Sequence, residues 1–176
     1  YEIWCIEDLV AFSNMVNGSG VKLENGNSVE ITTSNNFSGK YVVLKTSLNF
    51  KSKLSYQDSE RIDFGDINGI EDDGNILMKE MTTGTGFTPI GTSNKTFNGI
   101  FNGKNYKIYN VYIDYSQEEV KPTVGVFGTI VNAKISNLEI SGQIKGNWET
   151  GGIAGCVNGG NVEIDNCVNK ANIVRI

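Results

Sequence analysis

The residues best suited to hold an ion lie in an acidic stretch within residues 51–86. Its oxygen-bearing side chains at close spacing are Asp66, Asn68, Glu71, Asp72 and Asp73. Two glycines, Gly69 and Gly74, allow the chain to bend around an ion, and Ca²⁺ prefers oxygen ligands on such a loop. The order does not match an EF-hand loop, and a solvated acidic loop is the alternative. The segment therefore predicts calcium as the one candidate metal.

A second candidate site is aromatic. Tyrosines recur at positions 106, 109, 112 and 115, and Trp148 lies in a later polar segment. Strand alternation turns Tyr112 outward, so Tyr112, Tyr115 and Trp148 are candidates for the exposed rings with which sugar- or peptide-binding surfaces make contact. Packing in the core or along a seam is the alternative for each ring.

The chain contains no histidine. This excludes Ser-His-Asp and Cys-His nucleophilic machinery, histidine-ligated zinc and the H-E-x-x-H motif within these residues. A serine or cysteine nucleophile would need a lysine as its base, and no spacing nominates one.

Carbohydrate chemistry is the enzyme class that remains. Glycosidases and polysaccharide lyases use paired carboxylates, and a glycosidase needs them about 5 to 10 Å apart across an open groove. The repeated part of the chain offers four carboxylates near one outer face, namely Asp114, Glu139, Glu163 and Asp165. Column alignment places Glu139 between Tyr112 and Val168, with no carboxylate next to it. Scattered, solvated carboxylates are the default interpretation.

The three cysteines, Cys5, Cys156 and Cys167, have no metal-binding spacing. Cys167 takes the place of an apolar residue in earlier repeats, which predicts a small core side chain. A disulfide between Cys156 and Cys167, which an oxidising compartment would permit, is the alternative.

The elements that must position these residues are repeats. The phrase IYNVYI at 108–113 returns as ISNLEI at 135–140 and as IDNCVN at 164–169. A second phrase, GVFG at 125–128, returns as GIAG at 152–155. Both markers give a period of 27 to 29 residues, and no repeat has helical periodicity. The period therefore predicts a mainly β chain folded as a right-handed parallel β-helix, or solenoid, with about three strands per turn and turns about 4.8 Å apart.

Stacked turns place equivalent residues in columns. We expect Ala154 to lie over Phe127, and repeated asparagines to occupy bends, with left-handed backbone and an amide bond to the next turn. The predicted interior column consists of Ile108, Ile135 and Ile164. A second consists of Val111, Leu138 and Cys167. The asparagines are Asn110, Asn137 and Asn166.

One helix is predicted, over 6–16, with Leu9, Phe12 and Val16 on one face and an end at Asn17-Gly18. It would cover the first turn of the solenoid as a lid. The whole chain, 1–176, is then one β-helix domain: a helical cap (1–18), first turns (19–50), an irregular acidic insertion (51–86) and regular turns (87–176). Because a strand-like run reaches Ile176 with no polar cap, we expect a continuing chain or another chain at that end.

Composition sets limits on partners. Of 176 residues, 21 are glycine and 2 are proline, as suits many short strands and turns. The net charge of -5 argues against nucleic acid as a partner. No apolar run is long enough for a transmembrane segment, no signal peptide heads the chain, and the first residue is not methionine, so a processed or subcloned segment is expected.

The chain resembles the GLUG-motif β-helix proteins of bacterial surfaces. The resemblance rests on GVFG at 125–128, more loosely on GIAG at 152–155, and on FNGIFNGKNYKIYNVYI at 97–113. It extends over most of the chain outside 51–86. Asn102 and Asn105 depart from the family's usual Asp and Gly. Such modules occur in secreted adhesins and in non-catalytic regions of IgA-protease-like metallopeptidases, so the resemblance implies surface display.

The sequence thus predicts a non-catalytic, secreted or cell-surface module of a larger bacterial protein, adhesive or a spacer. Its expected partner is a host or bacterial surface protein or a glycan, and end-to-end contact through the last turn is a further expectation. No cofactor other than calcium is expected from the sequence. A carbohydrate-active β-helix, lyase or glycosidase-like, is the alternative.

Overall fold

The computed structural model describes residues 1–19, 21–22, 28–29, 33–50 and 84–176. Within them the chain is mainly β, with one helix, as predicted. The helix is α1 (Ile6–Asn17). The strands are β1 (Glu2–Ile3), β2 (Val21–Lys22), β3 (Ser28–Val29), β4 (Tyr41–Leu44), β5 (Leu48–Asn49), β6 (Ile100–Asn102), β7 (Lys107–Asp114), β8 (Phe127–Ile130), β9 (Lys134–Ser136), β10 (Glu139–Gly146), β11 (Ala154–Val157), β12 (Glu163–Asp165) and β13 (Val168–Arg175).

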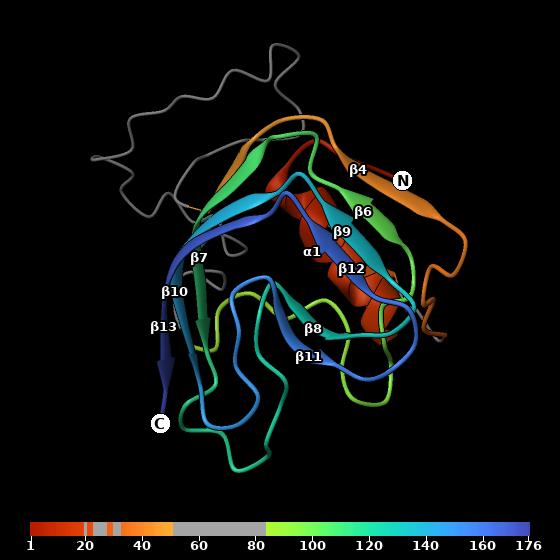
Figure 1. The fold of residues 1–176 in the computed structure, drawn as a ribbon. Coiled ribbons are helices and arrows are strands. Elements are labelled where there is room, and N and C mark those ends of the chain that lie inside the picture. The colour runs from red at the N-terminus through yellow and green to blue at the C-terminus, as the bar shows by residue number, and fades with distance from the viewer. Residues whose placement is uncertain (20, 23–27, 30–32, 51–83) are drawn as a thin grey trace.

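Parallel pairing dominates the sheets. One sheet has the order β1-β4-β6-β9-β12, a second has β13-β10-β7-β5, and β8 pairs with β11. Every pair in these three sheets is parallel, whereas β2 and β3 pair antiparallel. Figure 1 shows that strands from successive repeats lie side by side, with β8, β9 and β10 followed by β11, β12 and β13.

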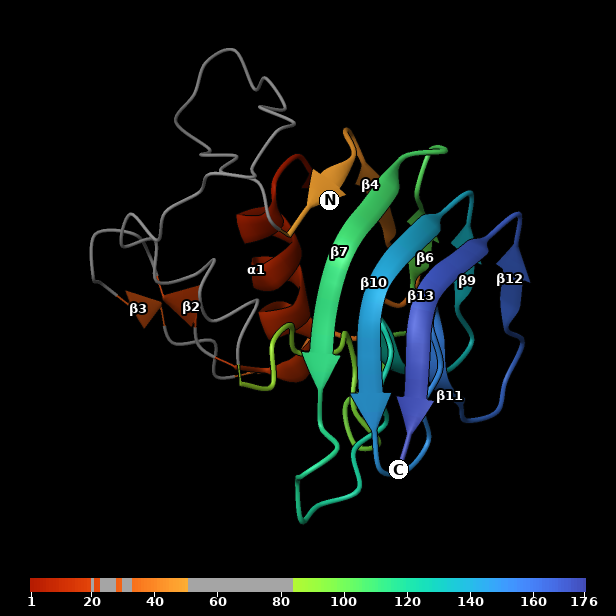
Figure 2. The same cartoon turned by 90° about the vertical axis from the view of Figure 1, so that its left-hand side faces the viewer.

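Helix α1 lies at one end of these sheets, on the side away from β12 and β13 (Figure 2). The predicted face is confirmed, because Leu9, Phe12 and Val16 are fully buried. The helix ends at Gly18, whose left-handed backbone (φ 65°) directs its N–H back to the Asn14 carbonyl. The apolar face of α1 therefore closes one end of the core.

An aromatic cluster joins the helix to the strands. The Phe12 ring lies 5.6 Å from Phe97 and 6.2 Å from Phe101, measured between ring centroids. Phe127 lies 5.3 Å from Phe97 and 5.1 Å from Phe101. Edge and offset contacts of this kind stabilise a core beyond area burial. The cluster links α1 to β6 and β8 in one continuous core.

Two of the predicted stacks are confirmed. Ala154 pairs with Phe127, and Ile164 pairs with Ile135. The predicted place of Ile108 in the second of these columns is wrong. Ile108 lies in the other large sheet, where it pairs with Leu48 and with Ile140.

The reason is the longer bend before β7, since Phe101 of β6 takes the place opposite Ile135 and Ile108 falls in the next sheet. Strand β7 also has a bulge. Ile108 pairs with Ile140 but Val111 pairs with Gly142, so two residues of β7, Tyr109 and Asn110, oppose one residue of β10. The expectation that Val111 shares a column with Leu138 is therefore wrong. Gly142 (φ 137°) fits this close approach, since a Cβ there would lie 2.1 Å from the Val111 carbonyl oxygen.

Much of the predicted insertion at 51–86 lies outside the described residues. Its last residues pair with β7, because Gly86 forms an antiparallel bridge with Ile113 and Phe87 donates its N–H to the Tyr112 carbonyl at 2.9 Å. Of the described residues, α1 forms the only helix, and it is too short to cross a membrane.

Candidate functional site

The predicted aromatic residues lie near the ends of β7 and β10. The loop after β7 is held to the end of β10, since Tyr115 donates its N–H to the Lys145 carbonyl at 2.9 Å. The Asn147 amide donates to the Glu118 carbonyl at 2.6 Å, which joins the two loops a second time. Loops that follow neighbouring parallel strands meet at one edge of the sheet. The structure therefore brings residues 115–121 and 147–148 together.

Trp148 is the exposed ring of this loop pair, with 41% of its surface accessible. The Lys121 ammonium lies 4.6 Å from its ring centroid, close enough for a cation–π contact. We call Tyr115, Glu118, Lys121, Asn147 and Trp148 the loop site.

The two tyrosines have smaller accessible surfaces. Tyr115 is half-buried and packs against the hydrophobic core. Tyr112 is also half-buried, and Gly86 lies so close that an added Cβ would be 2.6 Å from its ring. Core or seam packing, the alternative stated for each ring, thus describes both tyrosines better than full exposure.

The predicted calcium ligands, Asp66, Asn68, Glu71, Asp72 and Asp73, lie outside the described residues. Among the described residues, no group of three or more His, Cys, Asp or Glu side chains is placed to hold a metal ion.

Three of the four candidate carboxylates of the repeats, Asp114, Glu139 and Glu163, form ion pairs with lysines. Glu139 lies 3.0 Å from Lys170 and 3.4 Å from Lys107. The hydrogen bond from Lys170, aided by the charge of Lys107, holds the pKa of Glu139 below its usual range. Glu139 pairs in register with Lys107 and Val168, so the expected neighbour Tyr112 is wrong and the expected Val168 is confirmed.

Asp114 and Glu163 are paired in the same manner. Burial opposes ionisation of Asp114, but hydrogen bonds from Ser116 and Lys145 outweigh it and lower its pKa. Glu163 lies 2.8 Å from Lys134. A general acid of a glycosidase needs a raised pKa, which neither Glu139 nor Asp114 has. This geometry fits structural ion pairs better than an acid–base pair.

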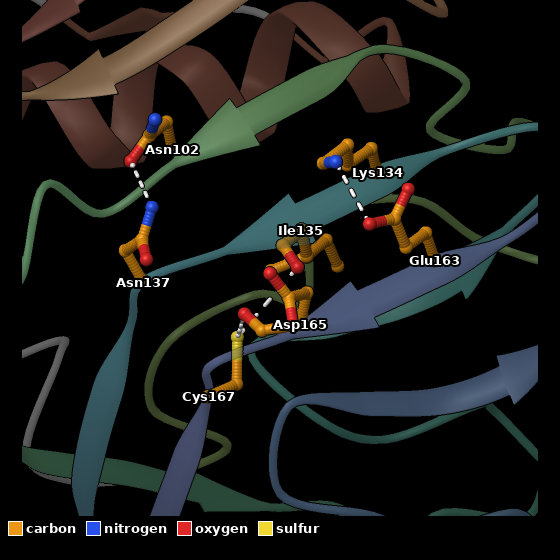
Figure 3. A network of polar contacts seen from close by, with 7 residues as sticks. All are labelled: Asn102, Lys134, Ile135, Asn137, Glu163, Asp165 and Cys167. Carbon is orange, nitrogen blue, oxygen red and sulfur yellow. Dashed lines mark hydrogen bonds and ion pairs between the residues drawn. The ribbon is translucent and has the colours of Figure 1, made fainter.

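All three cysteines are free thiols in the structure. Cys167 is half-buried against the core, and its Sγ donates to the Asp165 carbonyl at 3.3 Å (Figure 3). Burial is the main cause that raises the pKa of Cys167 and of Cys156. A raised pKa does not activate a thiol as a nucleophile, and Cys167 occupies the apolar position that the repeat predicted.

An asparagine ladder runs across the bend between two sheets. Asn137 donates its amide to Asn102 Oδ1 at 3.1 Å, and Asn166 donates to Asn137 Oδ1 at 2.8 Å (Figure 3). Asn137 (φ 55°) and Asn166 (φ 48°) have left-handed backbone, as predicted. Asn110 (φ 53°) is also left-handed, but it bonds to Asn49 at 2.8 Å because it lies in the β7 bulge.

Sequence reasoning missed Asn17, a buried polar residue at the end of α1. Its amide donates to the Pro89 carbonyl at 2.9 Å, and its Oδ1 accepts the Gly91 N–H at 3.0 Å. Lys95 Nζ donates to the Asn17 carbonyl at 2.7 Å. The sequence contained one sign of a polar contact here, because Asn17 lies one helical turn after Ser13. In the structure the Ser13 hydroxyl donates to the Thr88 carbonyl at 2.8 Å.

Comparison with known protein families, curated proteins and solved structures gives no match to the chain. Its function must therefore be inferred from the geometry above.

Proposed function

We propose that the chain is a right-handed parallel β-helix that serves as a non-catalytic module of a larger secreted or cell-surface bacterial protein. The observation that carries the proposal is the order of pairing. Three consecutive strands, β8, β9 and β10, pair in parallel with the next three, β11, β12 and β13. A solenoid is the simplest path for such a chain, and parallel crossovers are almost always right-handed.

Lysine–carboxylate pairs along the outer faces suit a passive rod. Glu139 neutralises charge from strands on both sides, and Lys134 and Glu163 join β9 to β12. Each repeat contacts only its neighbours in such a stack, so length can be added without a new core. This supports a spacer that displays another part of the protein.

The loop site supports an adhesive role in addition. An exposed indole with a nearby lysine, carbonyl groups and an amide combines a stacking surface with polar contacts, which suits a sugar ring. We infer a glycan, or a glycosylated surface protein, as the ligand of this site. Tyr112 and Tyr115 then support the loops from beneath and make little direct contact with the ligand.

A glycan array with the purified chain tests the adhesive role. Binding should be concentration-dependent, and Trp148→Ala should reduce it about tenfold or more, the effect of removing a central aromatic anchor. Tyr41→Ala is the matched control, because Tyr41 is 64% exposed but lies on β4 in another sheet.

An equal loss of binding in both variants would show that exposed aromatic rings bind nonspecifically, and it would refute the loop site. Absence of binding across glycans and glycoproteins would refute the adhesive role and leave the spacer. Turnover of a polysaccharide would overturn the non-catalytic assignment.

A further inference from the structure

The loop site already holds a cation of its own. The Lys121 ammonium lies 4.6 Å from the centroid of the Trp148 ring, and the face of an indole attracts positive charge. The ion pairs found among the described residues do not include Lys121, so no carboxylate in that part of the chain holds its ammonium. Lys121 therefore indicates which kind of group the exposed ring accepts, namely an ammonium on an aliphatic stem.

Carboxylates outnumber ammonium groups on the two loops, 115–121 and 147–149. Three negative side chains and one positive side chain give these residues a net charge of -2. Within the part of the chain that the structure describes, none of the three carboxylates forms an ion pair. A surface of this charge favours a cationic ligand. The carboxylates are those of Glu118, Glu119 and Glu149, and the ammonium is that of Lys121.

The Asn147 amide has only one of its two kinds of partner. Its N–H donates to the Glu118 carbonyl at 2.6 Å, whereas its Oδ1 is buried and accepts no hydrogen bond from the described residues. A buried acceptor without a donor is costly. An ammonium carries three donors and no acceptor, so a ligand that parts the loops can supply the donor that Oδ1 lacks.

Apolar surface lies beside these polar groups. Val120 directly precedes Lys121 and is 68% exposed, and the Trp148 ring is the second exposed apolar side chain of the loops. The C–H groups of a sugar ring pack on such a surface, whereas a bare ion would leave it in water. The combination favours a cation that is carried on a ring.

We propose that the loop site binds glycans through a protonated amino sugar, whose ammonium takes the place of Lys121 on Trp148 and lies near Glu118 and Glu119. Lys121 is then an internal competitor, which leaves the ring when the ligand binds. An acidic sugar fits less well, because its carboxylate would face three carboxylates and a single ammonium. The inference rests on the proposed adhesive function and adds the chemical class of the sugar.

Three oligosaccharides test this class on the purified chain by isothermal titration calorimetry. They are hexamers of glucosamine, N-acetylglucosamine and galacturonic acid, in a buffer that keeps the glucosamine amines protonated. The first two share a β-1,4-linked backbone and differ only in the acetyl groups, which remove the charge. The glucosamine hexamer should bind about tenfold more tightly than either of the others, since only its charge complements that of the loops.

Substitutions in the loops separate the roles of the side chains. Lys121→Met should raise the affinity for the glucosamine hexamer about two- to fivefold, because it removes an exposed cation–π competitor. Glu118→Gln with Glu119→Gln should lower that affinity about twofold or more. Trp148→Ala should lower it about tenfold or more. The matched control, Glu163→Gln with Asp165→Asn, removes the same charge from β12 and should leave the affinity unchanged.

Several results would overturn the amino sugar as the ligand. An equal loss in the control would show nonspecific attraction between charges, and weaker binding by Lys121→Met would make Lys121 a contact for an anion. Equally tight binding of a lysine hexamer would favour a basic peptide instead. Tightest binding of the acetylated or the acidic hexamer, lost in Trp148→Ala, would overturn this inference and leave the loop site. A chain that binds no glycan at all would refute the adhesive function itself.

Discussion

Replacing Asn137 separates the two contributions of the asparagine ladder to stability. Asn137→Ala removes two side-chain hydrogen bonds, one to Asn102 and one from Asn166, and forces alanine into a left-handed backbone of φ 55°. The bonds contribute about 1 kcal/mol each. The left-handed backbone costs alanine about 1 to 2 kcal/mol. We expect the free energy of unfolding to fall by about 3 kcal/mol.

Asn137→Gly removes the same bonds but tolerates the left-handed backbone. It should cost about 2 kcal/mol, so that alanine exceeds glycine by about 1 kcal/mol. The assay is equilibrium urea unfolding followed by circular dichroism, with an unchanged m-value. Asn172→Ala on the exposed face of β13 is the control and should change the free energy by less than about 0.5 kcal/mol.

Two results would refute this reasoning. A loss below about 1 kcal/mol for Asn137→Ala would mean that water replaces the ladder at no cost. Equal losses for alanine and glycine would mean that the left-handed backbone relaxes in the variant, so that φ at this bend is not enforced by the stack.

Three further predictions follow from the lid, the ion pairs and the acidic segment. Phe12→Ala should lower the free energy of unfolding by about 3 to 5 kcal/mol, measured by urea, because the ring is fully buried among Phe97 and Phe101. The lowered pKa of Glu139 stabilises the fold above the ordinary glutamate pKa, so the melting temperature should fall as the pH drops from about 5 to 3, and Glu139→Gln should flatten that fall. If calcium binds to Asp66, Asn68, Glu71, Asp72 and Asp73, a hundredfold excess over its dissociation constant should raise the free energy of unfolding by about 2.7 kcal/mol. The double variant Asp72→Asn and Asp73→Asn should abolish this increase. No increase in the unsubstituted chain would refute the calcium site.

The sequence predicted those features that depend on local chemistry. The helix, its apolar face and its glycine end follow from residue spacing and were confirmed. The left-handed asparagines were also predictable, because few side chains other than asparagine tolerate that backbone. Mainly β structure with parallel sheets followed from the repeat and was confirmed at that level.

The register was predictable only in the last repeats. Ile135 and Ile164 lie 29 residues apart and pair, whereas Phe101 and Ile135 pair at 34 residues. The bend before β7 is longer than the bend before β10, and β7 carries a bulge. These extra residues place Ile108 in a different sheet from Ile135, and they place Asn110 within β7, whereas Asn137 lies in the bend between β9 and β10. The two phrases nevertheless look alike in sequence.

Asn17 was missed for a different reason. Its partners, the Pro89 carbonyl and the Gly91 N–H, are backbone groups more than 70 residues away, and no pattern in the sequence links them. Burial of an asparagine costs desolvation free energy, which is offset only where both the amide N–H and the amide oxygen form hydrogen bonds. Only a folded chain reveals such a match.

The difference between a helix and a strand as a neighbour explains why Asn17 lies where it does. A helix placed over the first strands offers few backbone groups, because those of its interior are already bonded within the helix and only its last carbonyls bond outside it, as that of Asn17 does to Lys95. Asn17 and Ser13 supply side-chain groups in their place, and they bond to residues 88–91, which pair in turn with β8 through Ile90. A strand needs no such substitutes, since its backbone bonds directly to the neighbouring strand, as that of β12 does to β9. Helix α1 therefore joins residues 88–91 through side-chain hydrogen bonds, whereas the strands join one another through backbone ones.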